Sequence, residues 1–416
     1  MSSLLHYFNF GNSTKDTTPT KDAPVRALPA SWYTSQAMYD FERRAIFSRR
    51  WLFITHSSRL KEAGDFLRYK EVAGFDFIIV KDRQGKISAF HNVCRHRAYP
   101  VIEDEGAGNK KILSCRYHGW SYGLNGNLAK APGYQDLEFE KENNGLFTIH
   151  TKIDKNGFIW VNMDASAVPE VPWDEHFANV DVQARYSHIN FDDYVLDHTY
   201  ALDCAYNWKI ASDNFNECYH CPTTHPDIPA FLNLESFDSD TVAGHIQHHC
   251  VSTPEQLARG LDVHSTYYFP NVSMSASPHF MMIQKFEPRG PGESHIAYEV
   301  YRNRHSSDED FHAIADMYER VMREDKVLCD AAQRNLQRGV FVNGQLHPKY
   351  EKAPLFFQAT VREVVSEHFK REKDAGREIW PARQQVLGNL GGTDEDEEIC
   401  SGIACASGAV KEVLAW

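Results

Sequence analysis

The sequence predicts an α+β protein with two domains, an N-terminal all-β domain and a larger domain in which helices flank an antiparallel sheet. Three observations lead to this prediction. The chain has 416 residues, which is more than one typical hydrophobic core contains. Between residues 65 and 164, short apolar runs alternate with turn residues, as is typical of strands. The remainder mixes strand patterns with helical ones, including a long amphipathic pattern over residues 308–337.

The predicted domain boundaries follow these changes of pattern. Residues 1–44 form an N-terminal arm, rich in Ser, Thr, Pro and Lys, followed by the start of a helix. We expect the all-β domain over 45–165 and the larger domain over 166–385. Residues 386–416, with an acidic run and two cysteines, are expected to form a flexible tail.

Each expected element has a local reason. The turn Asp82-Arg83-Gln84-Gly85 joins two strands in a hairpin, and Pro222 stops the helix that precedes it. Ser307 caps the long helix with Asp310 in the capping-box position, and Gly339 ends it. In chain order we expect a helix over 38–51, strands over 75–80, 87–93 and 157–162, a helix over 208–219, strands over 267–269, 280–286 and 295–301, and the helix over 308–337.

Composition excludes several classes of function. Lys and Arg number 44 against 57 Asp and Glu, and the resulting net charge of −13 disfavours nucleic acid as a partner. The sequence contains no run of about 18 apolar residues, which is the length that spans a membrane, so no transmembrane helix is predicted. The segment Met1–Asp16 has no basic start and no long apolar stretch, so no secretory signal is expected. We expect a cytoplasmic protein with reduced cysteines, although the absence of acidic residues before Asp16 leaves organellar targeting open.

The first motif places two Cys and two His on two loops of the all-β domain. Cys94-Arg95-His96 is followed after 18 residues by Cys115-Arg116-Tyr117-His118. Such a set holds either a tetrahedral zinc ion or a [2Fe–2S] cluster in which two His bind one of the irons. The C-x-H half is unusual for zinc fingers and favours the cluster.

The second motif is Glu217-x-x-His220-x4-His225. If the segment is helical up to Tyr219, Glu217 and His220 share one face, and Pro222 lets His225 turn back toward them. Two His and one carboxylate form the facial triad of non-haem Fe(II) oxygenases, which leaves positions open for O2. The carboxylate is either Glu217 or one from elsewhere in the chain.

The long helix supplies a candidate for this carboxylate. Asp325 falls in the middle of its apolar stripe, three residues after Met322 and three before Leu328. A carboxylate on a core face is costly unless it is paired or binds a metal. Glu324 points about 100° away. Asp325 is therefore the expected third ligand, with a buried ion pair to an Arg as the alternative.

Both motifs resemble those of the Rieske non-haem iron oxygenases. The runs NVCRHRAYP and CRYHGWSYGLNGNL are similar to the two cluster loops of that family, and the resemblance covers about residues 40–370. It implies an N-terminal Rieske domain and a catalytic domain of helix-grip type. Ala98 stands where many members of the family have Gly. The resemblance implies a [2Fe–2S] cluster on Cys94, His96, Cys115 and His118, and Fe(II) on His220, His225 and Asp325.

The resemblance also implies roles for two further residues. Glu217 is then not an iron ligand but bridges, by hydrogen bonds, a cluster His of one subunit and an iron His of the next within a head-to-tail homotrimer. Asn214 matches an Asn near the iron of the family. Aromatic-ring dioxygenases usually have Asp at the bridging position. Glu217 instead resembles the branch that oxidises choline, glycine betaine, carnitine and stachydrine.

These parts together predict oxygenation of a small molecule with O2. Because no G-x-G-x-x-G motif opens a βαβ unit, electrons are expected from a separate NAD(P)H-dependent reductase or ferredoxin. The leading hypothesis is a monooxygenase that converts choline to betaine aldehyde, in betaine biosynthesis. The alternatives are N-demethylation of a betaine-like compound and hydroxylation or demethylation of an aromatic or secondary metabolite. A redox carrier without oxygenase chemistry is the alternative from another class, and it would hold two irons instead of three.

Other residues are given weaker interpretations. A quaternary ammonium group is recognised by aromatic faces, and the suspects for this role are Tyr206, Trp208, Tyr267, Tyr268 and Phe269. The run His245, His248 and His249 is interpreted as solvated. The cysteines interpreted as small buried apolar side chains are Cys204, Cys218, Cys221, Cys250 and Cys329. Cys400 and Cys405 are attributed to chance spacing in the tail.

Overall fold

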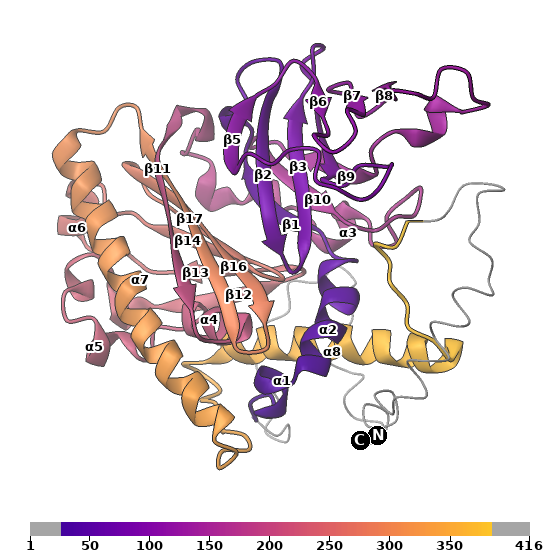
Figure 1. The fold of residues 1–416 in the computed structure, drawn as a ribbon. Helices are drawn as coiled ribbons and strands as arrows, with labels where there is room; N and C mark the ends of the chain where they lie inside the picture. The colour runs from indigo at the N-terminus through magenta and orange to yellow at the C-terminus, as the bar shows by residue number, and fades with distance from the viewer. Residues whose placement is uncertain (1–25, 385–416) are drawn as a thin grey trace.

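The computed structural model describes residues 26–384, which form two antiparallel seven-stranded sheets with helices at one end and on one face (Figure 1). The acidic run, Cys400 and Cys405 lie outside the described residues. Among residues 26–384, no helix is long and apolar enough to cross a membrane.

The first sheet and a small three-stranded sheet make up the N-terminal part. The order of the first sheet is β1-β10-β9-β4-β3-β2-β5. Its strands are β1 (Leu52–His56), β2 (Asp65–Val72), β3 (Phe75–Lys81), β4 (Ile87–His91), β5 (Gly106–Asn109), β9 (Thr148–Ile153) and β10 (Phe158–Asn162). The small sheet contains β6 (Leu113–Ser114), β7 (Ser121–Tyr122) and β8 (Leu128–Lys130). The predicted hairpin of β3 and β4 and the strand over 157–162 are confirmed.

The second sheet carries the larger part of the chain, in the order β11-β17-β16-β15-β14-β13-β12. Its strands are β11 (Tyr194–Cys204), β12 (Asp238–Val242), β13 (His245–His249), β14 (His264–Tyr268), β15 (Val272–Ala276), β16 (Phe280–Gly290) and β17 (Glu293–Asn303). The three strands predicted in this region correspond to β14, β16 and β17. The α+β architecture with an all-β N-terminal part is therefore confirmed.

Helices surround the second sheet. They are α1 (Ser31–Thr34), α2 (Gln36–Glu42), a π-helical turn at Arg43–Phe47, α3 (Trp173–His176), α4 (Trp208–Phe215), α5 (Cys221–Thr224), α6 (Pro254–Ala258), α7 (Asp308–Gln337) and α8 (Lys352–Ala375). Figure 1 shows α7 crossing the outer face of the sheet and α8 running below it. The bounds of α7 match the prediction, and the Ser307 side chain caps it by accepting from the Asp310 N–H.

Two predicted helices are shorter in the structure. In place of the helix expected over 38–51, the structure has α2 followed by a π-helical turn, and β1 begins at Leu52. The helix expected over 208–219 ends at Phe215. Pro222 then lies in the first turn of α5, where its missing N–H costs nothing, so it opens a new helix instead of stopping the old one.

The two sheets share a core and a buried polar network. The Phe53 ring of β1 packs 4.9 Å from the Tyr268 ring of β14. The Glu299 carboxylate of β17 accepts from Thr55 of β1 at 2.6 Å, from Arg59 at 2.6 Å and from Lys285 at 2.6 Å. These contacts fix the orientation of the N-terminal sheet on the second sheet.

Candidate redox and iron sites

The first motif lies on two equivalent loops beside the small sheet. The Cys94 carbonyl accepts from the Ala98 N–H at 2.9 Å, and the Cys115 carbonyl accepts from the Gly119 N–H at 3.1 Å. Each loop buries its Cys, whereas His96 is half-buried and His118 is exposed. The two His Nδ1 atoms lie 3.1 Å apart, so their Nε2 atoms stay free for other partners.

The ligand atoms of these four residues do not converge on one point. In the described part of the chain, groups of at least three His, Cys, Asp or Glu ligand atoms within 4.8 Å of one another occur only at His188–Asp262–His264 and at His220–His225–Asp325. A tetrahedral zinc site requires all four atoms around one centre. A paired arrangement instead fits a [2Fe–2S] cluster, in which each iron takes its own pair of side chains.

The backbone conformation of Ala98 explains why many members of the family that the sequence resembles have Gly at this position. Its φ of 57° lies in the left-handed region, as does the φ of 75° at Gly119 in the second loop. A Cβ atom in this region costs about 1 kcal/mol. Ala98 therefore strains the loop slightly, while its N–H still donates to the Cys94 carbonyl.

The second motif converges on one point together with α7. His220 and His225 are the N-cap and the C-cap of the single-turn helix α5, which is why four residues separate them. Asp325 projects from α7 toward both of them, and its Oδ1 lies 3.3 Å from His220 Nε2 and 3.0 Å from His225 Nε2. This donor set of two imidazoles and one carboxylate fits a facial iron triad.

Packing of α4 places this loop. Asn207 caps α4 by accepting from the Lys209 N–H. Glu42 of α2 accepts from the Trp208 indole at 2.9 Å and from the Lys209 ammonium at 2.6 Å, and all three side chains are buried. Charge and hydrogen bonds thus fix the N-terminal end of α4. The second motif, which starts at Glu217, comes directly after the C-terminal end of this helix.

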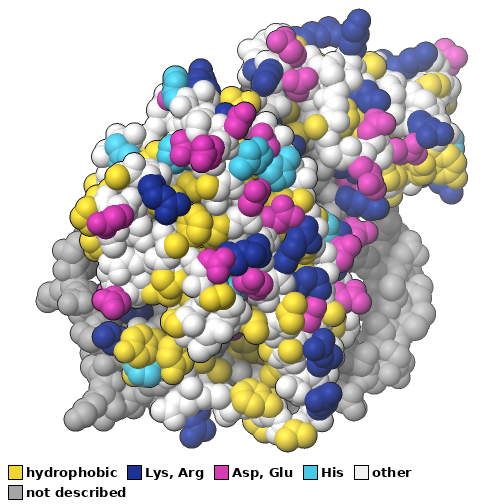
Figure 2. Space-filling model, turned by 90° about the vertical axis from the view of Figure 1, so that its left-hand side faces the viewer, with side chains coloured by type: hydrophobic (Ala, Val, Ile, Leu, Met, Phe, Trp, Pro, Cys, Tyr) yellow, Lys and Arg dark blue, Asp and Glu magenta, His cyan; other side chains and the backbone are white. Residues whose placement is uncertain are grey.

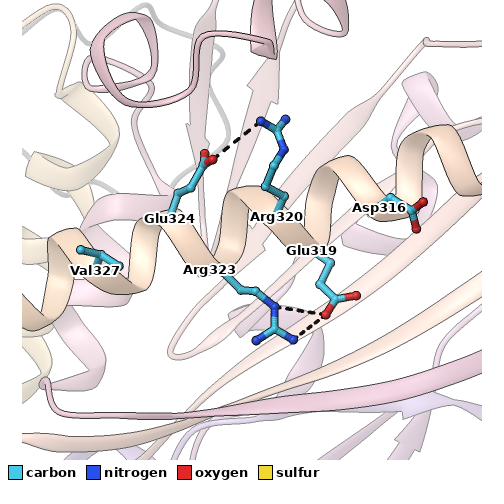
Figure 3. Close-up of a pocket in the computed structure, with 6 residues that line it drawn as sticks. All are labelled: Asp316, Glu319, Arg320, Arg323, Glu324 and Val327. Atoms are coloured by element: carbon cyan, nitrogen blue, oxygen red, sulfur yellow. Dashed lines mark hydrogen bonds and ion pairs between the residues drawn. The ribbon is translucent and has the colours of Figure 1, made fainter.

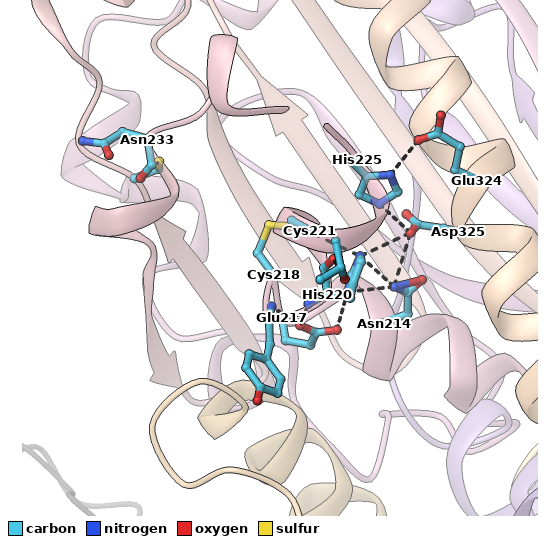
Figure 4. The surroundings of a disulfide bond; sticks show 12 residues. Asn214, Glu217, Cys218, His220, Cys221, His225, Asn233, Glu324 and Asp325 are labelled. Atoms are coloured by element: carbon cyan, nitrogen blue, oxygen red, sulfur yellow. Dashed lines mark hydrogen bonds and ion pairs between the residues drawn. A yellow bond between two sulfur atoms is a disulfide. The ribbon is translucent and has the colours of Figure 1, made fainter. Parts of the chain in front are cut away.

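Glu324 orients His225 from the side opposite Asp325. The His225 Nδ1 donates to Glu324 Oε2 at 2.7 Å, and its Nε2 faces Asp325 and the candidate metal position (Figure 4). A ligating His with a carboxylate on its other nitrogen is a recurring arrangement. The helix pattern excludes Glu324 as a ligand but does not predict this orienting role.

The pKa values of the triad residues are consistent with a cation bound between them. Burial disfavours protonation of His220, but hydrogen bonds to Asp325 and Glu217 outweigh it and raise its pKa to about 10. Burial raises the pKa of Asp325, but hydrogen bonds from the two histidines hold the pKa below its ordinary value. Without a metal these groups share protons, and a metal ion replaces those protons.

Glu217 lies outside the triad but contacts it. Its carboxylate hydrogen-bonds to His220 Nδ1 and to the backbone N–H of Tyr219 (Figure 4). The contact arises from a turn and not from the helical i, i+3 face that the sequence suggested, because α4 ends at Phe215. Asn214, on α4, places its amide nitrogen 3.2 Å from His220 Nε2 and 3.4 Å from Asp325 Oδ1.

Two cysteines beside the triad are joined. Cys218 and Cys221 form a disulfide with a Cα–Cα separation of 5.0 Å (Figure 4). The interpretation of these two as independent buried thiols is therefore wrong, because the intervening turn brings their Cβ atoms within bonding range. Cys204 and Cys329 are buried free thiols as predicted, and Cys250 is half-buried.

A cavity of about 100 Å³ opens on the triad. Its polar lining contains Asn214, Glu217, His220, His225, His248 and Asp325, and its aromatic lining contains Phe215, Phe237 and Tyr318. None of the five suspected aromatic residues lines it. They are core residues; the Tyr267 hydroxyl, for example, donates to Ser212 Oγ at 2.8 Å inside the protein.

The histidine run on β13 is also different from the prediction. His245 and His248 are buried, whereas His249 is half-buried and pairs with Asp240 at 2.8 Å. The strands β12 and β14 pair with the edges of β13 and cannot cover its side chains; the His248 ring is buried because Phe215 and Phe237 pack against it.

A second hollow lies on the outer face of α7, and Glu324, which contacts His225, is one of its lining residues. Its charged side chains are paired along the helix, with Arg323 beside Glu319 and Arg320 beside Glu324 (Figure 3). Acidic and basic side chains are interspersed over this side of the molecule (Figure 2). Because these charges pair with one another, the hollow carries no unpaired charge pattern that indicates a ligand.

Family models match both parts of the chain. Residues 50–140 match the Rieske [2Fe-2S] domain, and residues 191–367 match the catalytic domain of the ring hydroxylating alpha subunit. The chain belongs to the Rieske non-haem iron oxygenases. A Rieske oxygenase carries a [2Fe–2S] cluster and a mononuclear iron, and both donor sets above fit these groups.

Curated relatives of this Rieske oxygenase extend over most of its length. The carnitine monooxygenase oxygenase subunit of Acinetobacter pittii (strain PHEA-2) is 26% identical over 357 residues, which is 82% of the chain and 95% of the relative. The chloroplastic choline monooxygenase of Spinacia oleracea is 27% identical over 374 residues, which is 88% of the chain and 82% of the relative.

Solved structures share the fold. A quaternary ammonium Rieske monooxygenase in complex with gamma-butyrobetaine has a TM-score of 0.72 and 25% identity, over 82% of the chain and 96% of that structure. Naphthalene 1,2-dioxygenase with indole bound has a TM-score of 0.67 at 19% identity, over 86% of the chain and 95% of that structure.

Proposed function

We propose that this Rieske oxygenase is a monooxygenase that hydroxylates a quaternary ammonium substrate, with choline as the first candidate. The cavity beside His220, His225 and Asp325 carries the proposal. One oxygen atom would enter the C–H bond next to the choline hydroxyl, and the resulting diol would lose water to give betaine aldehyde. The other oxygen atom would leave as water, with two electrons and two protons from outside.

The lining of this cavity suits a small cation. The described residues that line it include two carboxylates, Glu217 and Asp325, and neither Lys nor Arg. Faces of Phe215, Phe237 and Tyr318 offer the aromatic surface that a trimethylammonium group requires. A cavity of about 100 Å³ is smaller than the sites of drug-sized ligands, so it favours a substrate of few atoms.

The same lining favours an alcohol over a carboxylate-bearing betaine. A substrate carboxylate that is buried without a cationic partner pays a large desolvation cost. Among residues 26–384, the cavity offers no such partner. Choline carries no carboxylate, whereas carnitine and glycine betaine do. This difference supports choline, although carnitine is the substrate named for one group of relatives.

The chain's own residues have separate tasks in this proposal. His220, His225 and Asp325 hold the iron, Glu324 orients His225, and Cys94, His96, Cys115 and His118 hold the cluster. When bound, the iron supplies O2 activation and the cluster supplies electrons one at a time. A separate NAD(P)H-dependent reductase or ferredoxin delivers those electrons.

A head-to-tail homotrimer would connect the two centres. Within one chain, the loops beside β6 and β7 lie at the opposite end of the molecule from α5 (Figure 1). Glu217 contacts His220 next to a surface on which Tyr219 and Tyr350 stack at 5.5 Å, and these rings are 60% and 51% exposed. Exposed stacked aromatics beside the bridging carboxylate support docking of a neighbouring cluster domain there.

Product detection by mass spectrometry tests the proposal. The reconstituted protein, NADH and a surrogate reductase would meet choline, glycine betaine, carnitine, stachydrine and several aromatic acids in separate reactions. We expect betaine aldehyde from choline. Oxidation of an aromatic acid, with all four amines unchanged, would overturn the proposed substrate class.

A further inference from the structure

A second cluster of metal-ligating side chains lies at the start of β14 and shares no residue with the iron triad. His188, Asp262 and His264 each offer one ligand atom, and these three atoms lie within 4.8 Å of one another. His188 comes soon after a 3-10 turn at Ala184–Tyr186, Asp262 precedes β14, and His264 is the first residue of that strand. Two segments that are distant in the chain thus bring two imidazoles and a carboxylate together.

The distances within this cluster suit a shared ion better than hydrogen bonds. Asp262 Oδ2 lies 3.4 Å from His264 Nε2 and 3.9 Å from His188 Nε2. An N–H···O hydrogen bond spans about 2.7–3.2 Å. Two atoms that bind one tetrahedral ion at about 2.1 Å lie about 3.4 Å apart. The contact with His264 already has this length, and a small rotation of the exposed His188 side chain brings the second contact to it.

One ring nitrogen of the cluster has no partner of its own. His264 Nε2 is buried and makes no hydrogen bond within residues 26–384. Such an atom costs free energy unless a partner satisfies it, and a metal ion is such a partner. The side chains beside it reach the surface, since Asp262 is 32% and His188 is 48% exposed. An ion from solvent therefore enters between the three groups when these two surface side chains move apart.

The cluster lies on the other face of β14 from the iron cavity. Val263 and Ser265 line that cavity. His264 and Thr266 alternate with them and face the segment before β11, where the Tyr186 ring lies 6.0 Å from the His264 ring and the Tyr186 hydroxyl lies 2.7 Å from Thr266 Oγ1. An ion in the cluster is thus separate from the iron of the triad.

The charges and donor types indicate which ions fit. Arg185 is a neighbouring cation, but its guanidinium donates to the carbonyls of His248 and Ser265 at 2.7 and 2.9 Å and so points at the backbone of the sheet. Its charge weakens cation binding, and the carboxylate of Asp262 offsets it. Imidazole donors suit zinc, copper, nickel and iron, whereas magnesium and calcium prefer sites built from oxygen atoms.

We propose that His188, Asp262 and His264 bind a divalent transition-metal ion. The ion ties the segment before β11 to the start of β14, next to the existing contact between Tyr186 and Thr266. This site is additional to the cluster and the iron, and it does not depend on which substrate the protein oxidises. Because the unfolded chain does not hold the three groups together, the free energy of ion binding adds to the stability of the fold.

Metal analysis with zinc as the probe tests the site. The iron-loaded holoenzyme is dialysed without oxygen against micromolar free zinc set by a metal buffer, and zinc and iron are then counted. We expect one zinc per chain beside three irons. His188→Ala and His264→Gln should each lose the zinc and keep the irons. The matched control is His249→Gln, because His249 pairs with one carboxylate, that of Asp240, and lies outside the cluster.

Thermal unfolding gives a second readout. Zinc at a hundredfold excess over its dissociation constant should raise the melting temperature of the parent protein and of His249→Gln by about 3–5 °C, and that of the two cluster variants by less than about 1 °C. The visible spectrum of the Rieske cluster shows that each variant is folded. Asp262→Asn, which removes the charge at similar size, takes the place of His264→Gln if that variant is not.

Three results would overturn the site. They are a parent protein that binds no zinc, zinc that enters only as iron is lost, and zinc that survives both His188→Ala and His264→Gln. The second result would place the zinc in the triad, and the third would place it elsewhere in the chain. Choline oxidation plays no part in these measurements, so their failure leaves the proposed function untouched, and failure of the proposed function leaves this site standing.

Discussion

His225 and Glu324 are joined by a hydrogen bond of 2.7 Å that fixes the imidazole from the side away from the candidate iron position. Asp325, the next residue of α7, meets the other nitrogen of the same ring at 3.0 Å. Two consecutive residues of one helix thus clamp one histidine. The local helix geometry makes this feasible, because neighbouring positions point about 100° apart and reach opposite edges of the ring.

Removal of the Glu324 carboxylate should weaken iron binding without removing a ligand. For Glu324→Gln we expect a 10- to 100-fold loss of Fe(II) affinity, since orienting partners of ligating histidines typically contribute this much. Competition with a chelator measures it. Glu319→Gln on the same helix is the control, because Glu319 pairs with Arg323 on the surface. Equal affinities in the two variants would contradict the orienting role.

Loss of a triad residue should separate the two metal centres. His220→Ala and Asp325→Ala are expected to keep the visible spectrum of the Rieske cluster, to lose one of three irons and to lose all turnover. The reason is that the cluster loops share no residue with α5 or α7. Iron analysis and absorbance check this, and a bleached spectrum would mean that the two sites are wrongly assigned.

Glu217→Gln should affect electron transfer more than metal content. The amide keeps the size of the side chain but cannot accept two hydrogen bonds from imidazoles with the strength of a carboxylate. We expect all irons to remain and coupled turnover to fall by at least tenfold. Rapid-mixing measurement of cluster oxidation would show the slow step. Cluster oxidation at the parent rate would remove the bridging role.

The left-handed residue of the first cluster loop offers a stability test. Ala98→Gly should raise the free energy of unfolding by about 0.5–1 kcal/mol, because glycine adopts a φ of 57° without strain. Gly119→Ala should lower it by about 1 kcal/mol for the same reason. Thermal bleaching of the cluster absorbance measures both. Shifts of the same sign would refute the conformational explanation.

Glu287, buried on β16, should make stability depend on pH. Burial raises the pKa of its carboxyl to about 7, although Lys285 and Arg289 lower it. The folded state then binds a proton that the unfolded state releases, so this group lowers stability as the pH rises from about 4.5 to about 7. Glu287→Gln should gain about 1–3 kcal/mol at pH 8 and almost nothing at pH 5.

Chemical denaturation at the two pH values measures that difference. The matched control is Glu299→Gln on the adjacent strand. Lys285 and Arg59 pair with Glu299 and lower the pKa of its carboxyl to about 2 despite its burial. Its substitution should cost about 3 kcal/mol at pH 8, because two buried cations lose their partner. A loss of stability in Glu287→Gln at pH 8 would contradict the assignment.

Local patterns predicted much of this molecule. The alternating strands, the hairpin at Asp82, the capped helix 308–337 and both metal motifs follow from spacing and turn chemistry, which act over a few residues. Asp325 was selected over Glu324 from the apolar stripe of one regular helix. Some of the predictions that failed depended on where a segment ends. α4 stops at Phe215, and nothing within residues 208–219 marks that end; α8 was not predicted at all.

The sequence alone therefore determined the class of chemistry, because ligand types and their spacing are local properties. Only the tertiary structure decided which side chains surround the triad. Phe215, Phe237 and Tyr318 line the cavity instead of the five suspected aromatics, and His248 is buried because Phe215 and Phe237, from other segments, pack against its ring. Contacts between strands and helices distant in the chain depend on how the sheets pack, and no single segment encodes that packing.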